Sequence, residues 1–158
     1  LSKFDIYAGL TGPKNSVESV LSNGFLLTNG LIIRSTNVIP ENNDNEINKK
    51  QKIVGAILLN NETFEIDLSN NYEIINNFIL KFNEKSLSIF RLIHPKPDLL
   101  VIGLGKKTRM LDQSNKNFFK ELGIQLEVTS TLNACKNFDI LSTERKDQIG
   151  ALLLPPNV

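Results

Sequence analysis

A chain of 158 residues that is 41% hydrophobic and 22% charged has the composition of a globular protein and is long enough to bury a sizeable core. Its formal net charge of +1 gives no general attraction to nucleic acid or to an anionic membrane, and its single cysteine excludes an internal disulfide. The chain also has only one histidine, so it lacks the histidine and cysteine side chains that hydrolases and metalloenzymes commonly use. No metal site and no cofactor is therefore predicted.

The N-terminal part is expected to form an arm followed by a hairpin. Residues 1–16 are mixed in character and predict an extended arm, and Val17–Leu21 suits either a short helical turn or an edge strand. Two apolar runs flank Asn29-Gly30, so we expect strands at about 23–28 and 31–36 joined by a type I′ turn. Because the numbering begins at Leu1 and not at methionine, we expect that a presequence is absent from it.

Two polar insertions interrupt the single α/β domain predicted for residues 17–158. Residues 40–52 contain almost nothing apolar and predict a loop. An apolar strand over 53–59 and an alternating strand over 63–68 follow. A second insertion is expected near 69–83. The helical spacing of its apolar residues allows a helix over 70–83, and its many asparagines weaken that interpretation.

From residue 97 the sequence alternates between strands and helices, after a short helix that Pro95 ends. The unbroken apolar run Leu99–Gly103 is typical of a central strand covered on both faces. Such alternation predicts a three-layer α/β domain with a central mixed, largely parallel sheet, flanked by helices and an N-terminal antiparallel hairpin layer. The expected elements are a helix over 114–122 capped by Asp112 or Ser114, a strand over 124–128, a helix capped by Thr131, and a strand over 149–154.

The turn after Leu99–Gly103 is the main candidate for a binding site. Its glycines allow close approach of the backbone, and cations follow at the carboxyl end of a buried strand, where ligands of α/β sheets often bind. The turn could hold a phosphate or carboxylate, or its glycines could simply let the chain reverse, which the short Gly-x-Gly spacing favours. The candidate residues are Gly103, Gly105, Lys106, Lys107, Thr108 and Arg109.

Cys135 is the second candidate. In the first turn of a predicted helix, the helix dipole would lower its pKa and make it a nucleophile or redox sensor. It also shares an apolar stripe with Phe138, which favours a core residue instead, and no second cysteine supports chemistry.

Six segments carry a resemblance to a known family: Ser22–Phe25, Ile53–Gly55, Pro97–Gly105, Gly123–Val128, Thr131–Cys135 and Gly150–Pro156. They resemble the family of the mitochondrial complex I assembly factor 3, and the match is specific in the C-terminal half and looser upstream. The resemblance covers about residues 16–156 and implies a compact three-layer α/β domain. It also implies a mitochondrial matrix protein, peripheral to the inner membrane, that works with a second assembly factor and early hydrophilic subunits. It carries no catalytic residues.

These observations predict a non-enzymatic protein that binds other proteins during biogenesis of a respiratory-chain complex. Residues 1–13 and 40–52 are the preferred contact elements, because a disordered segment can order on binding. Two alternatives remain. The first is a resident structural subunit of another large mitochondrial assembly, such as the ribosome or a membrane complex, with RNA contact only within that assembly. The second is a small-anion binder or enzyme that uses the Gly103–Arg109 turn. No DNA partner is expected from the near-neutral charge.

Overall fold

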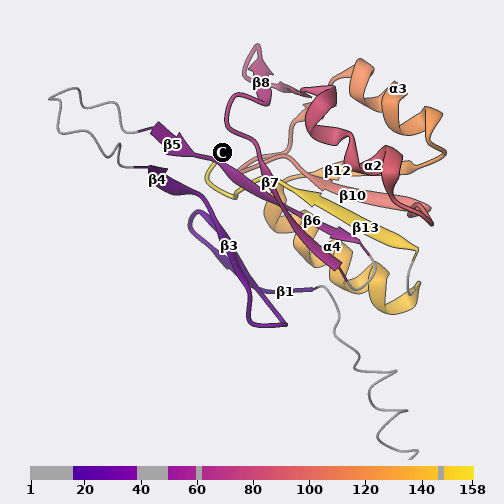
Figure 1. Cartoon of the computed structure of the whole chain (residues 1–158), viewed down its shortest axis with the longest axis horizontal. Coiled ribbons are helices and arrows are strands. Elements are labelled where there is room, and N and C mark those ends of the chain that lie inside the picture. Colours follow the sequence, from indigo (N-terminus) through magenta and orange to yellow (C-terminus); the bar gives the residue numbers. More distant parts are fainter. Residues whose placement is uncertain (1–15, 39–49, 60–61, 146–147) are drawn as a thin grey trace, which may run out of the picture.

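A five-stranded mixed sheet runs across the middle of the molecule (Figure 1). A computed structural model of the chain describes residues 16–38, 50–59, 62–145 and 148–158. The strand order of this sheet is β12 (Gln125–Thr129), β10 (Leu99–Gly103), β13 (Ile149–Leu153), β6 (Val54–Leu59) and β7 (Glu62–Asp67). Strands β12, β10 and β13 are parallel to one another, β6 is antiparallel to β13, and β7 is antiparallel to β6.

Strand β10 is buried on both faces, as its unbroken apolar run predicts. Leu100 and Ile102 pack into one hydrophobic cluster, whereas Val101 packs into a second cluster on the opposite face. Successive side chains of a strand point to opposite faces, so one strand can contribute to two cores. The two clusters make three layers, and the predicted three-layer α/β class is confirmed.

Helices cover both faces of the sheet (Figure 1). The first face carries the 3₁₀ helix η1 (Glu84–Leu87), α2 (Ile89–Leu92) and α3 (Gln113–Glu121), while α4 (Thr131–Glu144) covers the second. Asp112 caps α3 as predicted, because its side chain accepts a hydrogen bond from the Ser114 N–H at 3.0 Å. None of the helices in the described ranges is long and apolar enough to cross a bilayer.

The predicted N-terminal hairpin is present, but its turn differs from the prediction. It belongs to an antiparallel sheet of β1 (Val17–Leu21), β2 (Gly24–Leu27) and β3 (Ile32–Arg34), which settles Val17–Leu21 as a strand. The type I′ turn is wrong, because that turn needs positive φ at both central residues and only Gly30 has it. The Gly30 N–H donates to the Leu27 carbonyl and the Leu27 N–H to the Leu31 carbonyl, which gives a three-residue loop with glycine in the left-handed position.

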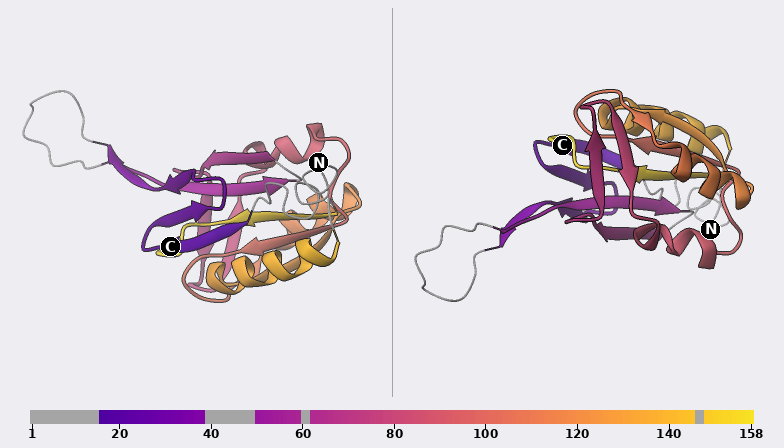
Figure 2. Two further views of the ribbon diagram at one scale, coloured as in Figure 1. Left: turned by 90° about the horizontal axis from the view of Figure 1, so that it is seen from below. Right: turned by 90° about the horizontal axis from the view of Figure 1, so that it is seen from above.

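The expected insertion over 40–52 falls largely outside the described residues. Its last three residues form β5 (Lys50–Lys52), which pairs with β4 (Thr36–Val38). Figure 2 shows these two strands leaving the body of the molecule as a narrow ribbon. The predicted loop is therefore wrong for residues 50–52, which form a strand, and residues 40–49 lie outside the described residues.

The helix that the apolar spacing allows over 70–83 does not form, because this segment is a β-hairpin. Strands β8 (Tyr72–Ile75) and β9 (Ile79–Phe82) pair antiparallel, and β9 also pairs with β11 (Met110–Leu111). Asn76 and Asn77 have φ values of 54° and 58° at the reversal, and asparagine tolerates this left-handed conformation better than most residues. The many asparagines were therefore the informative signal, rather than the helical spacing of the apolar residues.

Asn115 of α3 ties this hairpin to the body of the protein. Its side chain is fully buried and accepts a hydrogen bond from the Phe82 N–H at 2.7 Å. It also donates to the Phe82 carbonyl at 3.1 Å, so one amide satisfies both backbone groups of a buried residue. The sequence analysis assigned no role to Asn115, because nothing local marks a partner 33 residues away.

Candidate functional site

The glycine turn that follows β10 is closely packed against its surroundings. A Cβ atom on Gly103 would lie 2.7 Å from the Cα atom of Thr131 in α4. Gly105 has a φ of +99°, and a Cβ atom there would lie 2.7 Å from Nη1 of Arg109 and 2.8 Å from the carbonyl carbon of Val158. Both positions therefore need glycine, one for space and the other for space and conformation.

Thr131 holds the turn from the start of α4. Its hydroxyl accepts a hydrogen bond from the Gly105 N–H at 2.9 Å and donates to the Leu154 carbonyl at 2.8 Å. Its own N–H donates to the Gly105 carbonyl at 2.8 Å. The prediction that Thr131 caps α4 is wrong, because the capping residue is Ser130. Thr131 instead joins the ends of β10 and β13 to α4, at a position where α/β sheets often leave a crevice.

Replacing Thr131 with valine is expected to lower the free energy of unfolding by about 2–3 kcal/mol, since it leaves the Gly105 N–H and the Leu154 carbonyl buried without partners. Thr131→Ser, which keeps the hydroxyl, is the matched control and is expected to lose about 1 kcal/mol at most. Urea denaturation followed by circular dichroism measures both. A loss for Thr131→Val no larger than the loss for Thr131→Ser would contradict the assigned role of the hydroxyl.

The six residues predicted to hold an anion differ in their exposure to solvent. The Arg109 side chain is buried and donates to the Leu104 carbonyl at 2.7 Å, whereas Lys106, Lys107 and Thr108 are exposed. The N–H groups of Leu104 and Gly105 are already bonded within the protein. These two backbone N–H groups therefore cannot donate to an anion without losing their present partners. Anion binding by the lysines stays a prediction.

Arg109 also contacts the end of the described chain and lies near the β8–β9 hairpin. Its Nη2 donates to the Val158 carbonyl at 2.9 Å. Burial raises the pKa of the Tyr72 phenol, and the positive charge of Arg109 partly opposes that rise. The sequence analysis grouped Arg109 with Lys106 and Lys107 as a candidate anion site, because neither Val158 nor Tyr72 is near Arg109 along the chain.

Cys135 lies in the cluster between the five-stranded sheet and α4, together with Phe138. Burial raises the pKa of its thiol to about 12, which is opposite to the lowering expected from a helix N-terminus. The neutral thiol is therefore the form present at physiological pH. Whether it has any redox role stays a prediction.

The native Cys135 thiol is expected to react with a thiol reagent at pH 8 at least about 100-fold more slowly than the unfolded chain, because thiolate and access are both lacking. Its raised pKa also makes stability fall as pH rises from about 9 to about 12, since the unfolded chain loses the proton first. Urea denaturation of the protein and of Cys135→Ala over this range measures the difference. A native thiol that reacts as fast as the unfolded one would contradict its burial.

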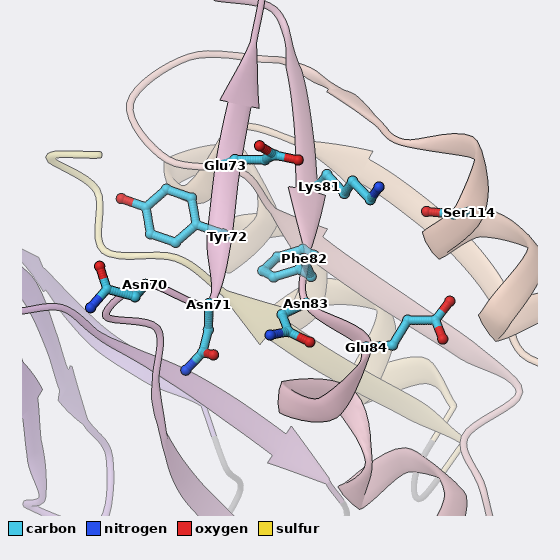
Figure 3. A pocket seen from close by; sticks show the side chains of 9 residues that line it. All are labelled: Asn70, Asn71, Tyr72, Glu73, Lys81, Phe82, Asn83, Glu84 and Ser114. Atoms are coloured by element: carbon cyan, nitrogen blue, oxygen red, sulfur yellow. The ribbon is translucent and has the colours of Figure 1, made fainter.

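A separate recess of about 680 Å³ opens over the base of the β8–β9 hairpin. Figure 3 shows Tyr72 and Glu73 on one strand, Lys81 and Phe82 on the next, and Ser114 on α3. The lining carries charged and amide groups and includes neither Cys135 nor any residue of the glycine turn. Within the described ranges, moreover, no three histidine, cysteine or acidic side chains gather where they could bind a metal ion.

The model of a protein family of unknown function, DUF498/DUF598, matches residues 21–154, which include the sheet and the glycine turn. The chain belongs to this family. It is also similar to NADH dehydrogenase [ubiquinone] 1 alpha subcomplex assembly factor 3 from several animals. The identity is 37% over 73 residues for Xenopus tropicalis, 40% over 72 residues for Danio rerio and 37% over 73 residues for Homo sapiens. The predicted resemblance to this assembly factor is confirmed.

These matches cover 46% of this chain and only 39–41% of each of those relatives. Similarity in structure extends further along this chain. A crystal structure described as an outer membrane protein from Bartonella henselae covers 90% of this chain and 97% of its own, with a TM-score of 0.59 and 17% identity. A Mth938-like domain from Bordetella pertussis covers 90% of this chain and 87% of its own, with a TM-score of 0.55 and 13% identity. At these identities the structural neighbours establish the fold alone.

Proposed function

We propose that this chain is a non-enzymatic mitochondrial assembly factor for the NADH dehydrogenase of the respiratory chain, and that it acts by binding partner proteins. The observation that carries the proposal is the 36–40% identity to relatives named as assembly factors of that complex. A location in the matrix, peripheral to the inner membrane, is part of the proposal. The arrangement of the glycine turn supports it, since the Gly105 amide and Arg109 hold neighbouring segments together.

The small sheet of β8, β9 and β11 supplies a surface suited to a protein partner. Its register pairs Ile75 with Ile79 and Ile79 with Met110, and cross-strand partners share one face. Met110 is 47% exposed, and Phe78 at the hairpin turn is 50% exposed. The opposite face carries the buried side chains of Leu80 and Leu111. An outward apolar face of this kind is a common site of contact between proteins.

Charge beside this surface indicates the chemistry of its partner. Glu73 and Lys81 are cross-strand partners on the same face as Ile79, and both are exposed. A partner segment with an apolar centre and both charges at its edge would complement them. We therefore commit to a segment of a complex I subunit or of a second assembly factor as the occupant. The arm over 1–13 and residues 40–49, also predicted to make contacts, lie outside the described residues.

The test is purification of the tagged full chain from mitochondria, with quantification of complex I subunits in the eluate. Phe78→Asp is expected to lower their recovery at least about tenfold, because it places a charge in an apolar contact. The matched control is Ile140→Asp, which changes an exposed apolar residue on α4 and should leave recovery unchanged.

Two outcomes would overturn different parts of the proposal. If the unaltered chain recovers no complex I subunits, the assembly role is wrong, and recovery of ribosomal proteins instead would favour a resident subunit of that assembly. If the subunits are recovered equally with Phe78→Asp and Ile140→Asp, the assembly role stands and the assigned surface is wrong.

A further inference from the structure

The recess at the base of the β8–β9 hairpin contains an unused hydrogen-bond donor and an unused acceptor. The Asn71 side chain donates through Nδ2 to the Asp67 carbonyl at 2.9 Å, and its Oδ1 accepts no hydrogen bond from the described residues. The Asn83 side chain accepts through Oδ1 from the Lys85 N–H at 3.1 Å, and its Nδ2 donates to none of the described residues. One atom of each amide therefore stabilises the fold, and the other is available to a ligand.

The pairing of the hairpin places these two amides on neighbouring residues. Tyr72 and Phe82 are cross-strand partners, and next to them the Asn83 N–H donates to the Asn71 carbonyl at 2.7 Å. Both asparagines line the recess, which has a volume of about 680 Å³ (Figure 3). Their side chains are held by the fold, because Asn83 caps η1 and Asn71 bonds the last residue of β7. The available acceptor and donor therefore lie at the wall of one cavity.

A residue of an extended polypeptide complements such a pair. Its N–H and C=O point to the same side, which is how opposite residues of an antiparallel sheet exchange two hydrogen bonds. The N–H would donate to Oδ1 of Asn71, and the C=O would accept from Nδ2 of Asn83. An oxyanion would satisfy only the donor, and a metal ion or an ammonium group only the acceptor. The two amides together therefore favour a peptide group over a simple ion.

The shape and charge of the recess indicate what kind of segment fits it. Its lining extends from Asn70, before β8, across both strands to Ser114 on α3 (Figure 3). Glu73 and Glu84 contribute two carboxylates to the lining, against the ammonium group of Lys81. A segment with more basic than acidic side chains complements this excess of negative charge.

We propose that the recess binds an extended, predominantly basic polypeptide segment of the assembly partner, through two backbone hydrogen bonds to Asn71 and Asn83. This inference rests on the proposed function, because it specifies the part of the partner that lies next to the apolar surface of the hairpin. Glu73 and Lys81 belong both to that surface and to the recess. In this mode of binding the backbone hydrogen bonds supply affinity and the side chains supply specificity.

Asn83→Asp removes the available donor and keeps the helix cap, since aspartate retains the oxygen that accepts from the Lys85 N–H. The matched control is Asn117→Asp, which adds the same charge on α3 outside the recess. Asn117 is also exposed, and its Oδ1 accepts a hydrogen bond from Nε2 of Gln113 at 3.0 Å. Circular dichroism and the melting temperature establish that both variants are folded.

The probe is a library of random short peptides displayed on phage and selected on the tagged full chain. Selected peptides are synthesised, and their Kd values are measured for the unaltered chain and both variants. They are expected to be rich in basic residues and to bind Asn83→Asp at least about tenfold more weakly than the other two proteins, because aspartate presents an oxygen to the peptide carbonyl. Attraction by charge alone would instead be strengthened by the added carboxylate.

The outcomes separate the recess from the assembly role. If no selected peptide distinguishes Asn83→Asp from Asn117→Asp, the recess site is overturned, whether or not complex I subunits are recovered with the chain. If a peptide distinguishes them, it should also displace recovered complex I subunits, and failure to displace them would overturn the partner as occupant. If no subunits are recovered at all, the assembly role is wrong and the peptide affinities still decide the recess. A dimer of the unaltered chain that Asn83→Asp dissociates would make a second copy the occupant and overturn the proposal.

Discussion

Gly105→Ala is expected to lower the free energy of unfolding by about 3 kcal/mol. The alanine Cβ would lie 2.7 Å from Nη1 of Arg109 and 2.8 Å from the carbonyl carbon of Val158, so either the guanidinium or the end of the chain must move. Such overpacking costs about 1–3 kcal/mol, and the left-handed φ of +99° adds about 1–2 kcal/mol for a residue with a Cβ atom.

Gly123→Ala separates these two causes. Gly123 also has a left-handed φ, +74°, but a Cβ atom there would meet nothing within 4 Å. Its replacement is therefore expected to cost only the conformational part, about 1–2 kcal/mol. Because the chain has no tryptophan, urea denaturation is best followed by far-ultraviolet circular dichroism. Equal losses in the two variants would show that Gly105 is needed for its conformation alone and that the contact with Arg109 is unimportant.

Phe119→Ala is expected to have the largest effect on stability, a loss of about 4–5 kcal/mol. Phe119 is fully buried, and its ring makes edge-to-face contacts with Phe90 at 5.2 Å and with Phe118 at 5.1 Å between centroids. Removing such a ring leaves a cavity that costs about 3–5 kcal/mol, and the aromatic pairs add about 0.5–1.5 kcal/mol each. A loss this large is a substantial fraction of the stability of a typical domain.

Phe78→Ala is the matched control for this prediction, because it removes the same atoms from a residue that is half exposed. Its free energy of unfolding is expected to change by about 0.5 kcal/mol or less. The same denaturation experiment measures both variants. A loss under about 1.5 kcal/mol for Phe119→Ala would contradict its place at the centre of the first cluster. The control also shows that Phe78 can be changed in partner-binding experiments without unfolding the protein.

Part of the fold could be predicted because its signals are local. The apolar run Leu99–Gly103 shows burial on both faces, and the observed strand sends alternate side chains into two clusters. Asp112 lies at the helix start that its side chain caps. The hairpin near Asn29-Gly30 was also predicted, although its turn type depends on the register of β2 and β3, which the dipeptide alone does not fix.

The β8–β9 hairpin shows why local periodicity can mislead. Leu80 and Phe82 alternate with exposed Lys81 on a strand, yet the wider apolar pattern also satisfies helical spacing. The choice between them is made by contacts distant in sequence. Asn115 bonds both backbone groups of Phe82, and β11 pairs with β9, so the segment gains partners only as a strand. Propensity is a weak guide where tertiary contacts of this kind exist.

The sequence by itself determined the alternation of strands and helices after residue 97, a helix start near Asp112–Ser114 and the position of a glycine turn. These features depend on neighbouring residues and on the periods of helix and strand. Only the tertiary structure decided what the turn contacts. Gly105 bonds Thr131, 26 residues away, and Arg109 bonds Val158, 49 residues away. Folding also turned Arg109 inward while leaving Lys106 and Lys107 outside, since burial follows from the positions of distant segments and not from residue type.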